Sequence, residues 1–363
     1  MVIGNICQAQ FQDYLIQDKF STICYIESNV PQTLKENKTE YELLLRNGDK
    51  IKPYTKRYSG TGFIVEREID LYLVTATHVA INTNPNSLIA FRSNSGESKL
   101  FDLRKIAGSS DKWWYHHPEG DISVIRIDPE LIEKEKCFKG HDMYFINNSN
   151  PPDDRSIEIT VIGFPLGIGF DVNNIEPISK TNRISSGQLR IPRFDNKVIS
   201  RMFLVDDPST SGFSGAPVFI TDEEFYSAPA RNDRDAVKDL IGVVHGTIND
   251  KKDGKFGAIT ISKLIIDAIE NCGGSDGIQE FTYNNGDKWA KIEIKNGSPF
   301  NVIYNLDKEG NPNNPGTLKN GTGTMYRFNE DSTISGVFEY LNGKLISSKI
   351  YPYYEYIKDY DEK

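Results

Sequence analysis

The sequence has few cysteines and no long apolar run, and both shortages limit what the protein can be. Its 363 residues include four cysteines, with no Cys-x-x-Cys spacing among them: Cys7, Cys24, Cys137 and Cys272. This pattern argues against a disulfide scaffold and against a zinc site, and mostly free, buried thiols are expected. No run of about eighteen apolar residues is present, so no membrane-spanning helix is expected.

Positive charge is also in short supply. The sequence carries 42 Lys and Arg against 51 Asp and Glu, which gives a net charge of −9. This balance argues against a nucleic-acid or anionic-membrane partner. Neither a metal nor a cofactor is expected, because the adjacent His116 and His117 have no further partner at ligand spacing. The length allows one large domain or two to three smaller ones.

The most informative stretch runs from Pro208 to Phe219. It places Ser214 between two glycines and follows it with an apolar run that predicts a strand. Glycine permits backbone angles that other residues resist, so the serine can stand on a sharp turn with amide N–H groups exposed. A hydroxyl beside such donors suits acyl transfer, because the donors stabilise a developing oxyanion. Taken alone, the stretch also fits an ordinary turn.

Two upstream stretches supply the partners that a serine nucleophile requires. A β-rich run from Leu71 leads to His78, and an alternating strand pattern begins at Asp121. A general base must take the proton of the serine, and a carboxylate must hold the imidazole in the correct tautomer. The order of His78, Asp121 and Ser214 therefore indicates a nucleophilic triad.

These stretches together resemble a trypsin-like (chymotrypsin-fold) serine protease of the bacterial type. The matching motifs are Thr75–His78 for Thr-Ala-Ala-His, Gly120–Val124 for Asp-Ile-Ala-Leu, and Gly212–Pro217 for Gly-Asp-Ser-Gly-Gly-Pro. The glutamyl-endopeptidase and HtrA-like branches look most similar. The resemblance implies an all-β fold with two six-stranded antiparallel β-barrels, a C-terminal helix and an active site between the barrels.

The resemblance also implies a role for individual residues. His78 would be the general base, Asp121 its orienting carboxylate and Ser214 the nucleophile. The amide N–H groups of Gly212 and Ser214 would form the oxyanion hole. Phe213 stands where animal trypsins carry the aspartate that receives a new amino terminus after zymogen cleavage, so that route of activation is not expected.

The same resemblance implies a substrate pocket near Pro208, Val244, His245, Gly246 and Gly257. Pro208 would lie at its base and carries no charge, so a preference for Lys or Arg is not expected. In glutamyl endopeptidases a histidine on this strand helps bind an acidic side chain. His245 is displaced by one residue, which on a strand turns the side chain to the opposite face. We therefore expect a pocket for an uncharged side chain, with an acidic one as the alternative.

The composition changes near residue 278 toward Asn, Gly and Tyr. Asn-Gly recurs at positions 285, 296, 320 and 342. This dipeptide between alternating apolar runs predicts hairpins, because both residues tolerate positive φ. Residues 280–350 loosely resemble MORN-like repeats, which would imply a meandering sheet that binds a protein partner. A plain antiparallel extension is the alternative.

The predicted organisation has four parts. They are a signal remnant or disordered terminus (1–14), a trypsin-like domain (15–276), a MORN-like β-repeat module (280–350) and an aromatic, acidic tail (351–363). The trypsin-like domain is expected to end in a helix with Ser262 as its N-cap and with Gly273 and Gly274 after its last turn. The first ten residues resemble the end of a secretory signal, so a secreted or periplasmic location is slightly favoured over a cytoplasmic one.

The expected function is that of a serine endopeptidase, which hydrolyses polypeptide substrates through a Ser-His-Asp triad and an acyl-enzyme. The alternative is a catalytically silent, protease-like protein that binds a partner through its C-terminal module. The intact set of three residues favours the enzyme, because silent relatives need not keep all three.

Overall fold

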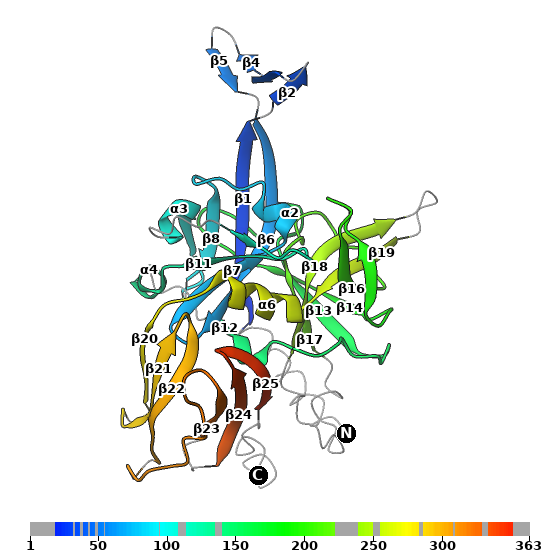
Figure 1. The fold of residues 1–363 in the computed structure, drawn as a ribbon. Helices are drawn as coiled ribbons and strands as arrows, with labels where there is room; N and C mark the ends of the chain where they lie inside the picture. Colours follow the sequence, from blue (N-terminus) through cyan, green and yellow to red (C-terminus); the bar gives the residue numbers. More distant parts are fainter. Residues whose placement is uncertain are drawn as a thin grey trace, which may run out of the picture.

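A computed structural model describes residues 19–31, 33–36, 39–42, 44–47, 50–53, 55–93, 95–107, 114–134, 140–221, 239–249, 255–282, 286–307, 309–328 and 333–350. The predicted signal remnant (1–14) and the tail (351–363) lie outside these residues. The described chain is mostly β-sheet with few helices, which confirms the all-β class (Figure 1). None of its helices is both long and apolar enough to cross a bilayer.

The first half of the chain forms an eight-stranded sheet in the order β10-β11-β7-β6-β1-β8-β9, with β12 also paired to β6. Its strands are β1 (Ile23–Pro31), β6 (Thr55–Arg67), β7 (Asp70–Thr75), β8 (Leu88–Arg92), β9 (Ser98–Asp102), β10 (Tyr115–His116), β11 (Ser123–Ile127) and β12 (His141–Asp142). Successive side chains on a strand point to opposite faces. Both faces of β6 are buried from Gly60 to Val65, with Phe63 in one core cluster and Ile64 in another.

The β1–β6 ladder is longer than the rest of this sheet. It runs from the Ile23–Phe63 pair to the Pro31–Thr55 pair. The connection between the two strands holds two short hairpins, formed by β2 (Thr33–Glu36), β3 (Thr39–Glu42), β4 (Leu44–Asn47) and β5 (Lys50–Pro53). Figure 1 shows this ladder rising out of the body with the short strands at its tip.

The second sheet has seven strands in the order β14-β13-β17-β18-β19-β16-β15. They are β13 (Glu158–Gly163), β14 (Ile178–Arg183), β15 (Leu189–Pro192), β16 (Ile199–Val205), β17 (Pro217–Ile220), β18 (Leu240–Asn249) and β19 (Lys255–Ile261). The sheets thus contain eight and seven strands where six each were expected, in part because β10 and β12 are added two-residue strands. No ladder joins β9 to β10 or β14 to β15 within the described residues, so closure into barrels stays a prediction.

The helices are short, with one exception. They are α2 (Thr77–Ala80), α3 (Leu103–Ile106), α4 (Pro129–Lys134), the 3₁₀ turns η1 (Met143–Phe145) and η2 (Pro165–Gly167), and α6 (Lys263–Cys272). The predicted helix is therefore present as α6, and it ends at Gly273 with φ of 80°. Ser262 occupies the predicted N-cap position, but its hydroxyl accepts no hydrogen bond from the helix and donates to the carbonyl O of Asn147 at 2.6 Å.

The C-terminal segment forms two three-stranded sheets. Their strands are β20 (Gly277–Thr282), β21 (Lys288–Lys295) and β22 (Ser298–Asn305), followed by β23 (Gly323–Phe328), β24 (Ile334–Leu341) and β25 (Lys344–Ile350). Asn296, Asn320 and Asn342 have φ of 49°, 51° and 52°, and the glycine after each also has a positive φ. These angles confirm the predicted turns at 296, 320 and 342, while Asn285 lies outside the described residues.

The three Asn-Gly turns are stacked on one another. The glycine N–H of each turn donates at 2.8 Å to a carbonyl O earlier in the chain, which belongs to Ser275, Phe300 and Gly321 in turn. The asparagine N–H of each donates to a side chain 19 or 20 residues earlier, on Asp276, Asn301 and Thr322. The C-terminal segment therefore has a repeating internal geometry.

Candidate active site

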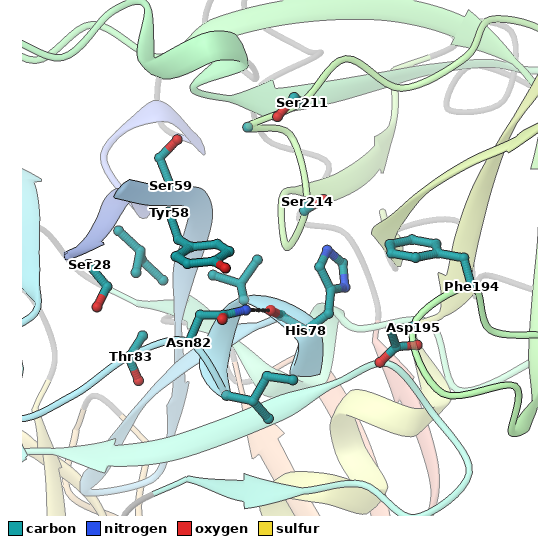
Figure 2. Close-up of a pocket in the computed structure, with 14 residues that line it drawn as sticks. Ser28, Tyr58, Ser59, His78, Asn82, Thr83, Phe194, Asp195, Ser211 and Ser214 are labelled. Atoms are coloured by element: carbon teal, nitrogen blue, oxygen red, sulfur yellow. Dashed lines mark hydrogen bonds between the residues drawn. The ribbon is translucent and has the colours of Figure 1, made fainter. Parts of the chain in front are cut away.

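His78 lies on α2, immediately after β7. The side chain of Thr75, the last residue of β7, donates to the carbonyl O of Thr61 on β6 at 2.7 Å and ties the end of the strand to its neighbour. The Asn82 side chain donates to the carbonyl O of His78 at 2.7 Å (Figure 2). The His78 ring directs Nδ1 at Asp121 Oδ2, at 2.7 Å. The histidine is thus held from both its backbone and its ring.

Asp121 lies in the tight segment between β10 and β11 and is fully buried. Burial works to raise the pKa of its carboxyl group, but hydrogen bonds from His245 and His78 outweigh it and hold the pKa below its usual range. A carboxylate in such a site stays ionised at neutral pH. It can therefore act as the acceptor that fixes the His78 ring.

Ser214 stands on a turn that only glycine can flank. Gly212 and Gly215 have φ of 98° and 86°, and a Cβ on either would lie 2.3 or 2.2 Å from a backbone oxygen. Thr61 anchors this turn to β6, because its N–H donates to the Ser214 carbonyl O at 2.9 Å and its hydroxyl donates to that of Gly212 at 2.7 Å. The serine turn of the second sheet is thereby fixed against the first sheet.

Ser214 and His78 line one pocket of about 340 Å³. Figure 2 shows the His78 ring below Ser214, with Phe194 beside it. The other lining residues come from β1, β6, the α2 region, the β15–β16 turn and the serine turn: Ile26, Ser28, Tyr58, Ser59, Val79, Ile81, Asn82, Thr83, Asp195, Ser211 and Gly212. Within the described chain, the N–H groups of Gly212 and Ser214, two residues that line the pocket, have no hydrogen-bond acceptor.

None of the five residues expected around a specificity pocket lines this pocket. A Cβ on Gly246 would lie 2.8 Å from the ring of Phe194, and one on Gly257 would lie 2.4 Å from Val205. The carbonyl O of Pro208 accepts from Lys180 Nζ at 3.1 Å, and Val244 is buried in the core. The space beside both glycines is thus closely packed.

His245 lies on β18, in contact with Asp121 and with the ring of His78. It is 1% exposed, and its Nδ1 lies 2.5 Å from Asp121 Oδ2. The backbone N–H of Phe194 donates to its Nε2 at 3.3 Å. Both ring nitrogens of His245 are therefore engaged inside the protein.

Sequence reasoning missed the turn between β15 and β16. Arg193 is 2% exposed, and its guanidinium donates to Asp121 Oδ1 at 2.8 Å and to the Gly120 carbonyl O at 2.7 Å. The Phe194 ring packs on His245 with centroids 4.3 Å apart and on His78 at 5.0 Å. The only sign in the sequence is an arginine beside an aromatic residue in a polar turn, which has no specific meaning by itself.

The ligand-type atoms of His78, Asp121 and His245 lie within 4.8 Å of one another. Both histidines direct Nδ1 at the same Asp121 oxygen, at 2.7 and 2.5 Å. Zinc would need about 2.0–2.2 Å to each donor atom and open space among them. These contacts are hydrogen bonds that already fill that space, so the arrangement matches a hydrogen-bonded triad better than a metal site.

No family model and no curated protein matches the chain. Among solved structures, it is similar to an inactive form of the Rv3671c protease, which comes from M. tuberculosis H37Rv, at 15% identity and a TM-score of 0.41, over 72% of this chain and 94% of that one. It is similar to Deg5 at 16% identity and a TM-score of 0.42, over 71% and 92% of the two chains. The HtrA-type protease AlgW with a tripeptide gives 14% identity and a TM-score of 0.42, over 93% and 96%. At these values the meaning of the site rests on its own geometry.

Proposed function

We propose that the protein is a serine endopeptidase. The observation that carries the proposal is the His78–Asp121 pair, in which Nδ1 is bound to a buried carboxylate while the ring lines the same pocket as Ser214. The two unused N–H groups of Gly212 and Ser214 add donors for an oxyanion. Base, orienting carboxylate, hydroxyl and donors are the four parts that acyl transfer needs.

The proposed reaction proceeds through an acyl-enzyme. The Ser214 hydroxyl gives its proton to His78 Nε2 while Oγ bonds to the substrate carbonyl carbon, and the resulting oxyanion accepts from the Gly212 and Ser214 N–H groups. The intermediate then breaks its C–N bond, and His78 returns the proton to the leaving amine. A water molecule then gives a proton to His78 and attacks the acyl-enzyme carbonyl. The bond to Ser214 Oγ breaks, His78 returns the proton to that oxygen, and the acid is released. Asp121 keeps its negative charge throughout and holds Nδ1–H.

The pocket in Figure 2 is proposed to hold the residues after the scissile bond, which leave with the amine. It extends from Ser214 past His78, the residue that would protonate this amine, to the rest of the α2 region. For the other side of the scissile bond we keep the expected preference for an uncharged residue. The alternative acidic preference would need a free His245 ring, and that ring is engaged with Asp121 and Phe194. A peptide library is expected to show no preference for Lys, Arg or Glu, and a strong preference for any of these would contradict this proposal.

We further propose closure of the two large sheets into barrels, domain boundaries at 15–276 and 280–350, and a secreted or periplasmic location. The stacked Asn-Gly turns support a MORN-like module at residues 280–350, with a protein partner as its ligand. If the triad were silent, this module would carry the function alone.

A fluorophosphonate probe tests the central proposal, since it reacts with an activated serine. The wild-type protein is expected to be labelled and to hydrolyse peptide esters, and Ser214→Ala to do neither. Ser209→Ala is a matched control, because Ser209 precedes the turn and does not line the pocket. A folded wild-type protein that resists labelling would favour the silent, partner-binding alternative.

A further inference from the structure

We infer that Arg193 and His245 are positioning residues of the proposed triad, which hold the Asp121 carboxylate through hydrogen bonds from the second sheet region. The inference rests on the proposed function, and it concerns residues that the three matched motifs do not contain. Arg193 comes from the β15–β16 turn and His245 from β18, so both belong to the sheet that carries Ser214. Asp121 and His78 belong to the other sheet region.

The Asp121 carboxylate is saturated with donors. Oδ1 accepts from the His78 backbone N–H at 3.1 Å and from Arg193 Nη2 at 2.8 Å. Oδ2 accepts from His78 Nδ1 at 2.7 Å and from His245 Nδ1 at 2.5 Å. Each oxygen thus accepts two hydrogen bonds, one from each sheet region, and has no lone pair left. The carboxylate cannot rotate without breaking hydrogen bonds to both sheet regions.

The tautomer of His245 follows from its second contact. Phe194 N–H donates to His245 Nε2, so that nitrogen is an acceptor and carries no proton. The proton of the neutral ring then lies on Nδ1, where it points at Asp121 Oδ2. His245 is therefore a neutral donor to the carboxylate, and Phe194 sets this state through its backbone.

Arg193 supplies the positive charge beside the carboxylate. Its guanidinium is almost fully buried and bridges two acidic groups, with Nη2 at 2.8 Å from Asp121 and at 2.5 Å from Asp195. Buried charges persist when they are paired and hydrogen-bonded. The Gly120 carbonyl O accepts from Nη1 at 2.7 Å, so the same fork holds both Asp121 and the residue before it.

This arrangement has a consequence for proton transfer. The charged and titratable groups that contact the carboxylate are His78 from α2, His245 from β18 and Arg193 from the β15–β16 turn. Arg193 in turn contacts Asp195, and its charge also acts on His116 and His117. Arg193→Met removes a permanent cation that contacts this carboxylate, so the acidic limb of activity is expected to move to higher pH.

The first test needs no activity. Long-range ¹H–¹⁵N NMR spectra of the five histidines identify the tautomer of each ring, and assignment uses His245→Gln. We expect His245 as the neutral Nδ1–H tautomer, in the wild type and in Ser214→Ala alike. An Nε2–H tautomer or a charged ring at neutral pH would overturn the inference, even if the protein were a working protease.

The second test compares pH profiles of kcat/KM for the wild type, Arg193→Met, Arg193→Lys and the control Arg183→Met, whose partner Glu158 lies away from the site. Arg193→Met is expected to move the acidic limb up by about one pH unit. Arg193→Lys keeps the charge and loses the fork, so its limb should stay while kcat falls roughly tenfold at unchanged KM.

The outcomes separate the two proposals. If Arg193→Met does not fold, the Lys variant decides, and a loss expressed in KM alone would contradict a positioning role. If Arg193→Met folds and the acidic limb of its kcat/KM profile does not move, that result would also contradict a positioning role. A wild type that the fluorophosphonate probe does not label would remove the protease proposal, while the NMR result would still decide whether His245 holds Asp121.

Discussion

Asp121 is the residue on which the two halves of the candidate site meet. A substitution to asparagine keeps its shape but replaces one acceptor oxygen with an NH₂ group, which would face a donor from His78, His245 or Arg193. Asp121→Asn is expected to lower kcat by about 10⁴-fold, because the His78 tautomer is no longer fixed. The measurement is ester hydrolysis by the purified variant, with Asp195→Asn for comparison. Activity within a few-fold of the wild type would contradict the role given to Asp121.

The same residue links stability to pH. The pKa of Asp121 is depressed in the folded protein, because hydrogen bonds from His245 and His78 outweigh the effect of burial. Its contribution is therefore fully present above the unfolded-state pKa, about 4, and is lost as pH falls toward the lower folded value. Urea unfolding of the wild type and of Asp121→Asn should differ by about 2 kcal/mol at pH 7, since Arg193 keeps its pair with Asp195 but loses its hydrogen bond to an ionised Asp121. The difference should shrink steadily below about pH 4. A difference that stays constant down to the acid transition would contradict this linkage.

Among the elements, those with local signals could be predicted from the sequence. The Asn-Gly turns, helix α6 and the strands around His78, Asp121 and Ser214 are each fixed by residues close in the chain. The contacts that complete the site could not be found this way, because no motif singles out Arg193 and His245 is expected at the substrate pocket instead of at Asp121. Arg193 and His245 reach Asp121 from 72 and 124 residues away, through the register of strands in another sheet. Ser262 is the N-cap by position, but the bond from its hydroxyl to the distant carbonyl O of Asn147 has no local signal either.

The stacking of the Asn-Gly turns can be tested at this scale. A Cβ on Gly321 would lie 2.9 Å from the backbone N of Gly343, in addition to the cost of a φ of 73°. Gly310 offers a matched control, because its φ is 83° and no atom lies within 4 Å of a Cβ there. Gly310→Ala is expected to cost about 1 kcal/mol for its backbone conformation. Gly321→Ala should cost at least about 1 kcal/mol more in urea unfolding, since the turns must separate. Equal losses in both variants would show that stacking contributes nothing.

At the scale of the whole molecule, the C-terminal sheets pack directly on the first sheet region. Tyr144 belongs to the same apolar cluster as Met325 and Phe338. Its hydroxyl bonds to Glu68 and to the hydroxyl of Tyr340. Gly274, just after α6, packs against the backbone of the Asn296 turn. The C-terminal segment is thus joined to the body by buried contacts, and it lies away from His78 and Ser214.

Arg327 is the charged centre of this contact. It lies 3.6 Å from Glu68 Oε2 and 3.5 Å from Asp142, and its guanidinium lies over the ring of Tyr144 at 4.4 Å. Burial raises the pKa of Glu68, and Arg327 acts against that rise. Arg327→Met is therefore expected to leave Glu68 buried without its cation and to lower the free energy of unfolding by about 3 kcal/mol. Lys319→Met, at an exposed position of the same segment, serves as the control. Because none of the residues of the proposed triad touches Arg327, the rate of fluorophosphonate labelling of the folded variant at low temperature should match that of the wild type. A large fall in that rate would show that this interface controls the site, and unchanged stability would show that the interface does not hold the two parts together.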